Sequence, residues 1–164
     1  MNFNLIKTQL IEWLTSFVEK PNPALNNWPP CLYARQARIN NKILIIESSI
    51  ADLTKTVNES LTMFGQYDVA VICFDHTLIS GEDCQQLALE LNANIMQNDY
   101  VLLEDHPDVK EYIAGVNMNF GQCGLFVISP LSKLTAASDQ IRAKGYYDTW
   151  SQSELDEVVT WRHK

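Results

Sequence analysis

Asp68-Val-Ala-Val-Ile-Cys-Phe74 is the stretch that decides the fold, because it is a short apolar run rich in β-branched residues. A run of this kind predicts a strand that is covered on both faces of a sheet. Three similar runs, Lys42-Ile-Leu-Ile-Ile46, Tyr100-Val-Leu-Leu103 and Gly124-Leu-Phe-Val-Ile128, predict three further strands. The four runs together predict one central sheet.

Segments with apolar residues three or four positions apart lie before, between and after these runs, and they predict helices. Ser49-Ile-Ala-Asp52 and Ser80-Gly-Glu-Asp83 each have the form of a capping box, with Asp in the place of Glu. We therefore expect an α/β (or α+β) fold with a central, mostly parallel four-stranded sheet flanked by helices. An N-terminal helix and a short C-terminal helix would be added to it.

The length of 164 residues suits one domain, since two well-buried cores need a longer chain. We expect an N-terminal helix in 1–20, a connector containing Pro and Asn in 21–41, the sheet core in 42–145 and a C-terminal helix in 146–164. The chain shows no signal-peptide pattern and no apolar run near the roughly 20 residues of a membrane span. We therefore expect a cytoplasmic protein that does not bind a membrane.

Acidic residues dominate the middle of the chain. The net charge is −8, and residues 41–110 hold three basic and twelve acidic side chains. Such a segment repels phosphate, so we expect no nucleic-acid binding. No Gly-rich loop follows the first predicted strand, so a nucleotide-cofactor motif is absent as well. The expected ligand is a small polar or cationic molecule, and a protein partner or a homo-oligomer is an alternative.

Two predicted strands are followed by the same dipeptide, Asp75-His76 and Asp105-His106. Parallel strands bring their carboxyl ends to one edge of a sheet, where such folds bind ligands. Imidazole beside carboxylate can move protons near neutral pH, so these four residues are the catalytic candidates. His76 and His106 are also candidate ligands of a divalent metal, the one possible cofactor that the sequence suggests.

Two alternatives to this site remain open. His76 could cap a turn while Asp75 and Asp105 accept backbone N–H bonds. An antiparallel third strand, as in the element order of a thioredoxin-like core, would separate the two Asp-His pairs. The C-x-x-C motif of that chemistry is absent in any case.

The segment Gly115-Val-Asn-Met-Asn-Phe-Gly-Gln-Cys-Gly124 is a second candidate region. Its glycines permit close backbone approach to a ligand, and Asn117 and Asn119 would offer amides to a substrate. The alternative is an irregular edge strand or turn in which the Asn side chains bond their own backbone.

Cys31 follows two prolines and lies near Arg35, which would lower the pKa of the thiol. Both residues are therefore candidates for substrate binding. The alternative is that Cys31 belongs to the start of a helix and packs as a small apolar residue.

Three short motifs, Cys31-Leu-Tyr-Ala34, His106-Pro-Asp108 and Asn119-Phe120, resemble an uncharacterised bacterial family. That family has a Cys-Pro-Phe-Ala motif after an N-terminal helix, and a His-Pro-Asp segment before an Asn-Phe pair. This chain departs from it at Leu32 and Tyr33. The resemblance implies no activity, but it implies that four residues lie near one another: Cys31, Arg35, His106 and Asn119.

The sequence favours a small enzyme that uses His and carboxylate side chains, or a metal, for chemistry on a small polar metabolite. The alternative is a non-catalytic binding or protein-interaction module, such as an accessory subunit. The amphipathic first helix would then contact a partner together with four aromatic residues near the C-terminus, Tyr146, Tyr147, Trp150 and Trp161.

Overall fold

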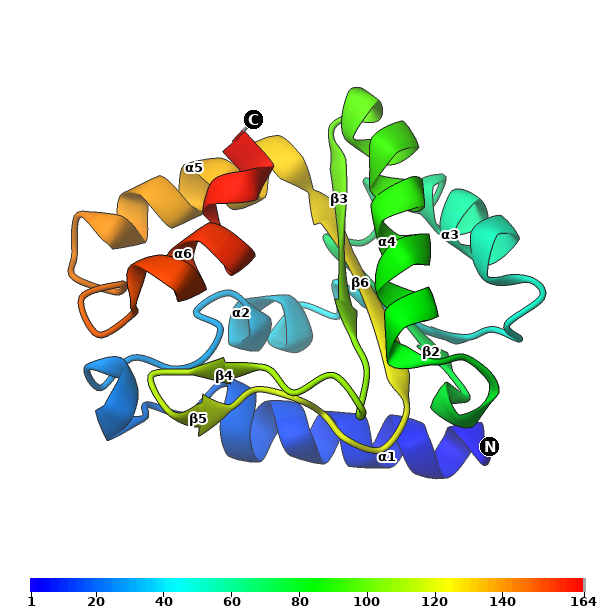
Figure 1. Ribbon diagram of the computed structural model, residues 1–164, viewed down its shortest axis with the longest axis horizontal. Coiled ribbons are helices and arrows are strands. Elements are labelled where there is room, and N and C mark those ends of the chain that lie inside the picture. Colours follow the sequence, from blue (N-terminus) through cyan, green and yellow to red (C-terminus); the bar gives the residue numbers. More distant parts are fainter. Residues whose placement is uncertain (164) are drawn as a thin grey trace.

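The structure, a computed structural model, describes residues 1–163 and contains a four-stranded sheet with helices on both faces (Figure 1). Across the sheet lie β1 (Ile43–Glu47), β2 (Val69–Phe74), β6 (Gly124–Pro130) and β3 (Tyr100–Asp105). β1 pairs with β2 in parallel, whereas β6 is antiparallel to both β2 and β3. The sheet is mixed, and the expectation of a mostly parallel sheet is wrong.

The insertion of β6 leaves the other three strands pointing the same way. β6 is antiparallel to both of its neighbours, so β2 and β3 share a direction although they do not touch. The chain leaves β3 at the carboxyl edge of the sheet and enters β6 at that same edge. An apolar run has the same pattern in both directions, which is why sequence patterns did not reveal the reversal.

The connection between β3 and β6 contains a small hairpin of β4 (Tyr112–Ile113) and β5 (Val116–Asn117). Its two turn residues, Ala114 and Gly115, have φ angles of 48° and 78°. Two successive positive φ values are the geometry of a type I′ turn, the common two-residue hairpin turn. β4 has no clear signal in the amino-acid pattern, because Ala occupies the turn position where Asn or Asp is usual.

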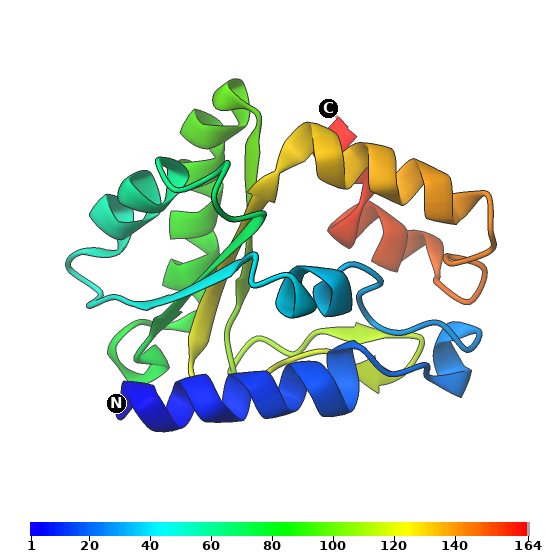
Figure 2. The same cartoon turned by 180° about the vertical axis from the view of Figure 1, so that it is seen from behind.

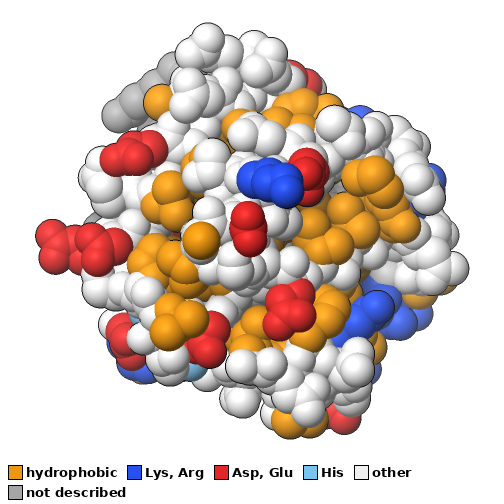
Figure 3. Space-filling view, turned by 90° about the vertical axis from the view of Figure 1, so that its right-hand side faces the viewer, with side chains coloured by type: hydrophobic (Ala, Val, Ile, Leu, Met, Phe, Trp, Pro, Cys, Tyr) orange, Lys and Arg blue, Asp and Glu red, His pale blue; other side chains and the backbone are white. Residues whose placement is uncertain are grey.

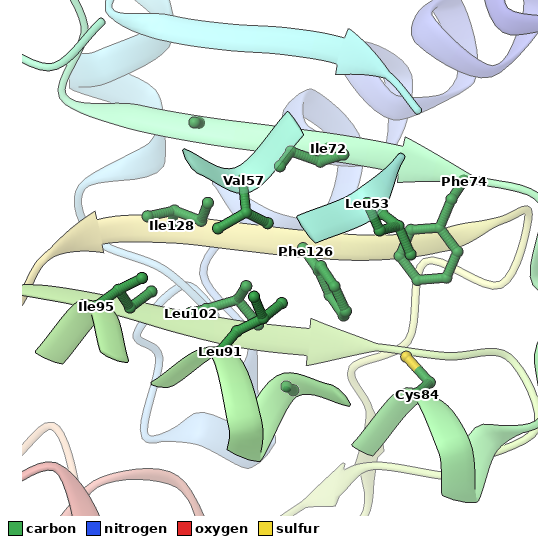
Figure 4. Packing of buried hydrophobic residues seen from close by; sticks show 12 residues of the cluster. Leu53, Val57, Ile72, Phe74, Cys84, Leu91, Ile95, Leu102, Phe126 and Ile128 are labelled. Carbon is green, nitrogen blue, oxygen red and sulfur yellow. The ribbon is translucent and has the colours of Figure 1, made fainter. Parts of the chain in front are cut away.

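α3 (Leu53–Leu61) and α4 (Gly81–Ile95) cover one face of the sheet. Figure 4 shows their apolar residues meeting those of β2, β6 and β3, with the rings of Phe74 and Phe126 5.0 Å apart. The expected cap at Ser80 is present, since its hydroxyl accepts from the N–H of Asp83 and donates to its carboxylate. Asn92 of α4 is buried and bonds both backbone groups of Leu102 in β3.

α1 (Phe3–Trp13) lies across the opposite face and continues as a π-helical turn over Leu14–Val18. Its buried residues pack on the second face of the sheet, where Phe120 and Cys123 complete the cluster. The connector contains a 3₁₀ turn at Pro23–Leu25 and α2 (Ala34–Ile39), which Figure 2 shows beside the sheet and above the C-terminal end of α1. A bidentate pair between Arg38 and Glu19, at 2.7 and 2.9 Å, joins α2 to the end of the first helix.

α5 (Leu131–Arg142) and α6 (Gln152–Val158) form the C-terminal part, and a 3₁₀ turn comes after them at Thr160–His163. Ser151 and Glu154 form a full capping box at the start of α6. Glu154 also accepts the backbone N–H of Ala114 at 2.8 Å, so the start of α6 holds the tip of the hairpin. The helix expected in 146–164 thus begins at Gln152, and the last residue of that range, Lys164, lies outside the described residues.

The outer surface of α3 and α4 carries scattered acidic side chains with hydrophobic ones between them (Figure 3). Within residues 1–163, no helix has the length and apolar character needed to span a bilayer.

Candidate functional site

The carboxyl edge of the sheet brings the two Asp-His dipeptides together. β2 leads into Asp75 and His76, and β3 ends at Asp105 with His106 directly after it. The rings of His76 and His106 meet edge to face, with centroids 5.8 Å apart. The same direction of β2 and β3 produces this meeting, although β6 lies between them.

His106 is buried, and both of its ring nitrogens have backbone partners. Nε2 lies 3.2 Å from the carbonyl oxygen of His76 and 3.1 Å from that of Ile79, so it carries the proton and donates. Nδ1 accepts the N–H of Asp108 at 3.2 Å. The ring therefore joins the 3₁₀ turn at His76–Leu78 to the turn after β3. No nitrogen is left for a metal or a substrate, and a catalytic role for His106 stays a prediction.

Asp75 acts as the cap of that 3₁₀ turn. Its Oδ1 accepts the hydroxyl of Thr77 at 2.7 Å and the backbone N–H of Thr77 at 3.1 Å. The hydroxyl bond is the main reason why the pKa of Asp75 is below its ordinary value. Asp75 and His76 do not line the cleft that runs along β3. Asp75 accepts a backbone N–H, as the capping interpretation expects, but the cap of the turn is Asp75 and not His76. A catalytic role for the two residues stays a prediction.

Asp105 holds the segment that comes after the hairpin. Its Oδ1 accepts the side-chain N–H of Asn119 at 2.8 Å, and its Oδ2 accepts the backbone N–H of Phe120 at 2.8 Å. Asn119 in turn donates to the carbonyl of Val109 and accepts the backbone N–H of Glu111. Burial raises the pKa of Asp105 in spite of these bonds. Asp105 and Asn119 together hold the backbone on both sides of the hairpin, and so fix the position of Glu111.

Asn117 is exposed and accepts the backbone N–H of Asn119 at 3.0 Å, as the local-turn interpretation expects. Asn119 lines the cleft along β3, whereas Asn117 does not. Of the two amides expected to bind a substrate, the structure places one at the candidate site.

Cys31 is half-buried beside the end of α1, and Arg35 is exposed on α2. Burial raises the pKa of the Cys31 thiol, and Arg35 is not among the groups that shift it. The expectation that Arg35 lowers the pKa of Cys31 is therefore wrong. Cys31 lines a small pocket next to the cleft, and Arg35 lines neither.

A cleft of about 620 Å³ lies along the edge strand β3, between α4, the hairpin and α6. Apolar walls come from residues that include Leu89 of α4, Val127 of β6 and Trp161. The acidic residues come from three places: Glu104 and Asp105 at the end of β3, Glu111 before β4, and Asp156 and Glu157 in α6. We call this region the carboxylate cleft.

Four of these carboxylates interact. Burial raises the pKa of Glu104, and the charges of Glu157 and Asp105 add to the shift. Burial also raises the pKa of Glu111, and with the charges of Asp105, Glu104 and Glu157 the value reaches about 7. None of the four forms an ion pair within residues 1–163. Lys110 also lines the carboxylate cleft, but its ammonium group donates to the carbonyl of Pro107 and forms no ion pair with the four carboxylates within residues 1–163.

Sequence reasoning missed Glu111 and Glu157 as site residues. Glu111 lies between His106 and the segment Gly115–Gly124, and Glu157 lies in the predicted C-terminal helix, of which only the aromatic residues were considered for contacts. The acidic excess of residues 41–110 includes Glu104 and Asp105 but neither Glu111 nor Glu157, so composition gave no signal for these two. Their meeting depends on the hairpin and on α6, which are set by tertiary contacts.

The described residues do not assemble three or more His, Cys, Asp or Glu side chains in an arrangement that holds a metal ion. The residues at the sheet edge therefore do not fit the metal alternative, because the nitrogens of His106 are already bonded and Asp75 caps a turn.

The four aromatic residues near the C-terminus do not form an exposed patch. Tyr146 and Tyr147 are buried, and Trp150 and Trp161 are half-buried. Tyr146 also donates its hydroxyl to the carbonyl of Pro30 at 2.6 Å. These contacts attach the C-terminal part to the connector of the same chain.

Comparisons with protein-family models, with curated proteins and with solved structures gave no match. The resemblance to the bacterial family with the Cys-Pro-Phe-Ala motif stays a prediction.

Proposed function

We propose that the protein binds a small organic cation in the carboxylate cleft, and that Glu111 releases its proton to solvent when the cation binds. The observation that carries the proposal is a cleft of about 620 Å³ that gathers Glu104, Asp105, Glu111 and Glu157 without an ion-pair partner within residues 1–163. A positive ligand would supply the missing compensation.

The raised pKa of Glu111 supports this release of a proton. A carboxyl with a pKa of about 7 is half protonated near neutral pH, so it can both accept and return a proton. A bound cation favours the ionised form and lowers the pKa again. Binding would therefore release a proton from Glu111, and affinity would rise as the pH passes through 7.

An organic cation fits better than a metal ion. The carboxylates come from β3, the hairpin segment and α6, and Trp13 and Trp161 stand among them. Aromatic and aliphatic walls suit the hydrocarbon part of an ammonium or guanidinium ion, and an indole face attracts its charge. A metabolite with an amine would be held with its ammonium group against the ionised carboxylate of Glu111, in a charge-assisted hydrogen bond.

The test is a titration with propylammonium and with guanidinium, followed by the backbone NMR signals of residues around Glu111. We expect binding that tightens about tenfold from pH 6 to pH 8, because the ionised fraction of a group with a pKa near 7 changes by that factor. Glu111→Gln should abolish this pH dependence and weaken binding.

The matched control is Glu59→Gln, an exposed carboxylate on α3 that does not line the carboxylate cleft, which should bind as the unmodified chain does. Equal binding of propylammonium and of acetate, or unchanged binding by Glu111→Gln, would contradict the proposal.

A further inference from the structure

A second, smaller pocket of about 190 Å³ adjoins the carboxylate cleft. The two share four lining residues: Trp13, Glu111, Met118 and Val158. Beyond this common wall the smaller pocket is formed by the end of α1, the connector and the hairpin. We call it the apolar pocket.

The chemistry of the apolar pocket differs from that of the cleft. Three aromatic residues line it, Trp13, Phe17 and Trp150, and aliphatic side chains and Cys31 complete it. Glu111 is the one charged residue among the described residues that line it. A single carboxylate thus stands at the junction of an acidic space and an apolar one.

We propose that the ligand is an amphiphilic amine, whose ammonium group lies against Glu111 and whose hydrocarbon or aromatic tail occupies the apolar pocket. This inference rests on the proposed function and adds the substrate class. A cation bound at the junction has its other substituents directed either among carboxylates or among apolar side chains. The apolar pocket is the better place for a tail, because Glu111 is its one charged lining residue, whereas the apolar walls of the cleft stand among four further carboxylates.

The size of the pocket limits the tail. A volume of 190 Å³ compares with roughly 30 Å³ for one water in the liquid, so the pocket accepts about five carbon atoms or one aromatic ring. Each buried methylene strengthens binding by up to about fourfold. The gain should end when the pocket is full.

The experiment is a calorimetric titration with the n-alkylammonium ions from ethyl to octyl at pH 8. We expect the Kd to fall about threefold to fourfold for each methylene up to about five or six carbons and then to level off. A Kd that does not change with chain length, while ethylammonium binds and Glu111→Gln weakens it, would overturn this inference and leave the proposed function standing. Hexanol that binds as tightly as hexylammonium would overturn both.

Cys31→Leu fills the apolar pocket without touching the carboxylate cleft. We expect this variant to weaken hexylammonium at least tenfold and to leave ethylammonium unchanged, while Cys31→Ala keeps the dependence on chain length. An equal effect of Cys31→Leu on both ions would contradict the assignment of the tail.

The unmodified chain provides an independent test. Cys31 is half-buried, whereas Cys73, Cys84 and Cys123 are buried, so iodoacetamide should alkylate Cys31 first. Hexylammonium should slow this alkylation, and ethylammonium at equal saturation should not. Equal rates with the two ions would overturn the inference.

Discussion

Asp75-His76 and Asp105-His106 are the same dipeptide at the ends of two strands that point the same way, yet their surroundings give them opposite properties. Asp75 caps a turn and its pKa is lowered, whereas Asp105 bonds a returning loop and its pKa is raised by burial. His76 is half-buried, whereas His106 is buried with both nitrogens bonded.

The difference comes from the segments that the chain enters after each dipeptide. After His76 the chain makes one 3₁₀ turn and enters α4. After His106 it makes a long excursion through the hairpin, which folds back over the end of β3 and closes the carboxylate cleft. The same dipeptide thus caps a turn before α4 in one place and supports the carboxylate cleft in the other. Substitutions in the two dipeptides should therefore change the stability of the protein by different amounts.

The largest difference is expected between the two histidines. His106→Ala removes a buried ring and leaves two carbonyl groups and one N–H without their partner, so we expect the free energy of unfolding to fall by about 3 kcal/mol. His76→Ala, the matched variant, should cost less than about 1 kcal/mol. Urea denaturation of both variants measures these changes. Equal losses in the free energy of unfolding would show that His76 and His106 contribute equally to stability.

A smaller effect on stability is expected from pH, through Glu111 in the carboxylate cleft beside Asp105-His106. A carboxyl whose pKa is higher in the folded chain holds its proton more tightly when folded, so stability is lost as the pH rises through the interval between the two values. For Glu111 that interval runs from its ordinary 4.5 to about 7. We expect Glu111 to account for a fall of about 2 kcal/mol in the free energy of unfolding between pH 5 and pH 8.

Glu111→Gln should remove this part of the fall in the free energy of unfolding with pH. The variant should therefore be more stable than the unmodified chain at pH 8, but not at pH 4. Denaturation at both pH values tests this, with Glu59→Gln, which lies outside the carboxylate cleft, as the control. If Glu111→Gln leaves the pH dependence of the free energy of unfolding unchanged, the carboxyl of Glu111 has the same pKa in the folded and unfolded chains, which would contradict the prediction.

The smallest effect is expected at Asp75. Its pKa is lower in the folded chain, so its contribution is present above its ordinary value and is lost as the pH falls through the folded value, the opposite direction from Glu111. Asp75→Asn keeps an oxygen that can accept from Thr77, and we expect the melting temperature at pH 7 to fall by about 1 °C or less. Thermal melts at pH 7 and pH 3 measure this. A fall that is larger at pH 3 than at pH 7 would contradict it.

The elements of the core could be predicted because their signals are local. The apolar runs at β1, β2, β3 and β6 and the cap at Ser80 depend on residues that are neighbours in the sequence. The order and direction of the strands cannot be read from neighbouring residues, because β6 inserts between β2 and β3 through contacts between distant parts of the chain. That one placement separates the observed mixed sheet from the expected parallel one.

The candidate site was predictable only in part. The edge of the sheet and Asp105 could be inferred from strand ends, and Asn119 from a segment whose length and composition are unusual. The carboxylate cleft also needs Glu111 and Glu157, which are 46 positions apart in the sequence and meet because Glu154 holds the hairpin tip. No local pattern contains that information.

The central position of β6 has a consequence for how the protein is made. The strand that joins β2 to β3 is the last of the four to leave the ribosome, so until residues 124–130 emerge the nascent chain exposes two apolar strands with unpaired edges. Completion of the sheet therefore has to wait until residues 124–130 have been synthesised and have left the ribosome. Until then the unpaired edges of β2 and β3 are open to pairing with other chains.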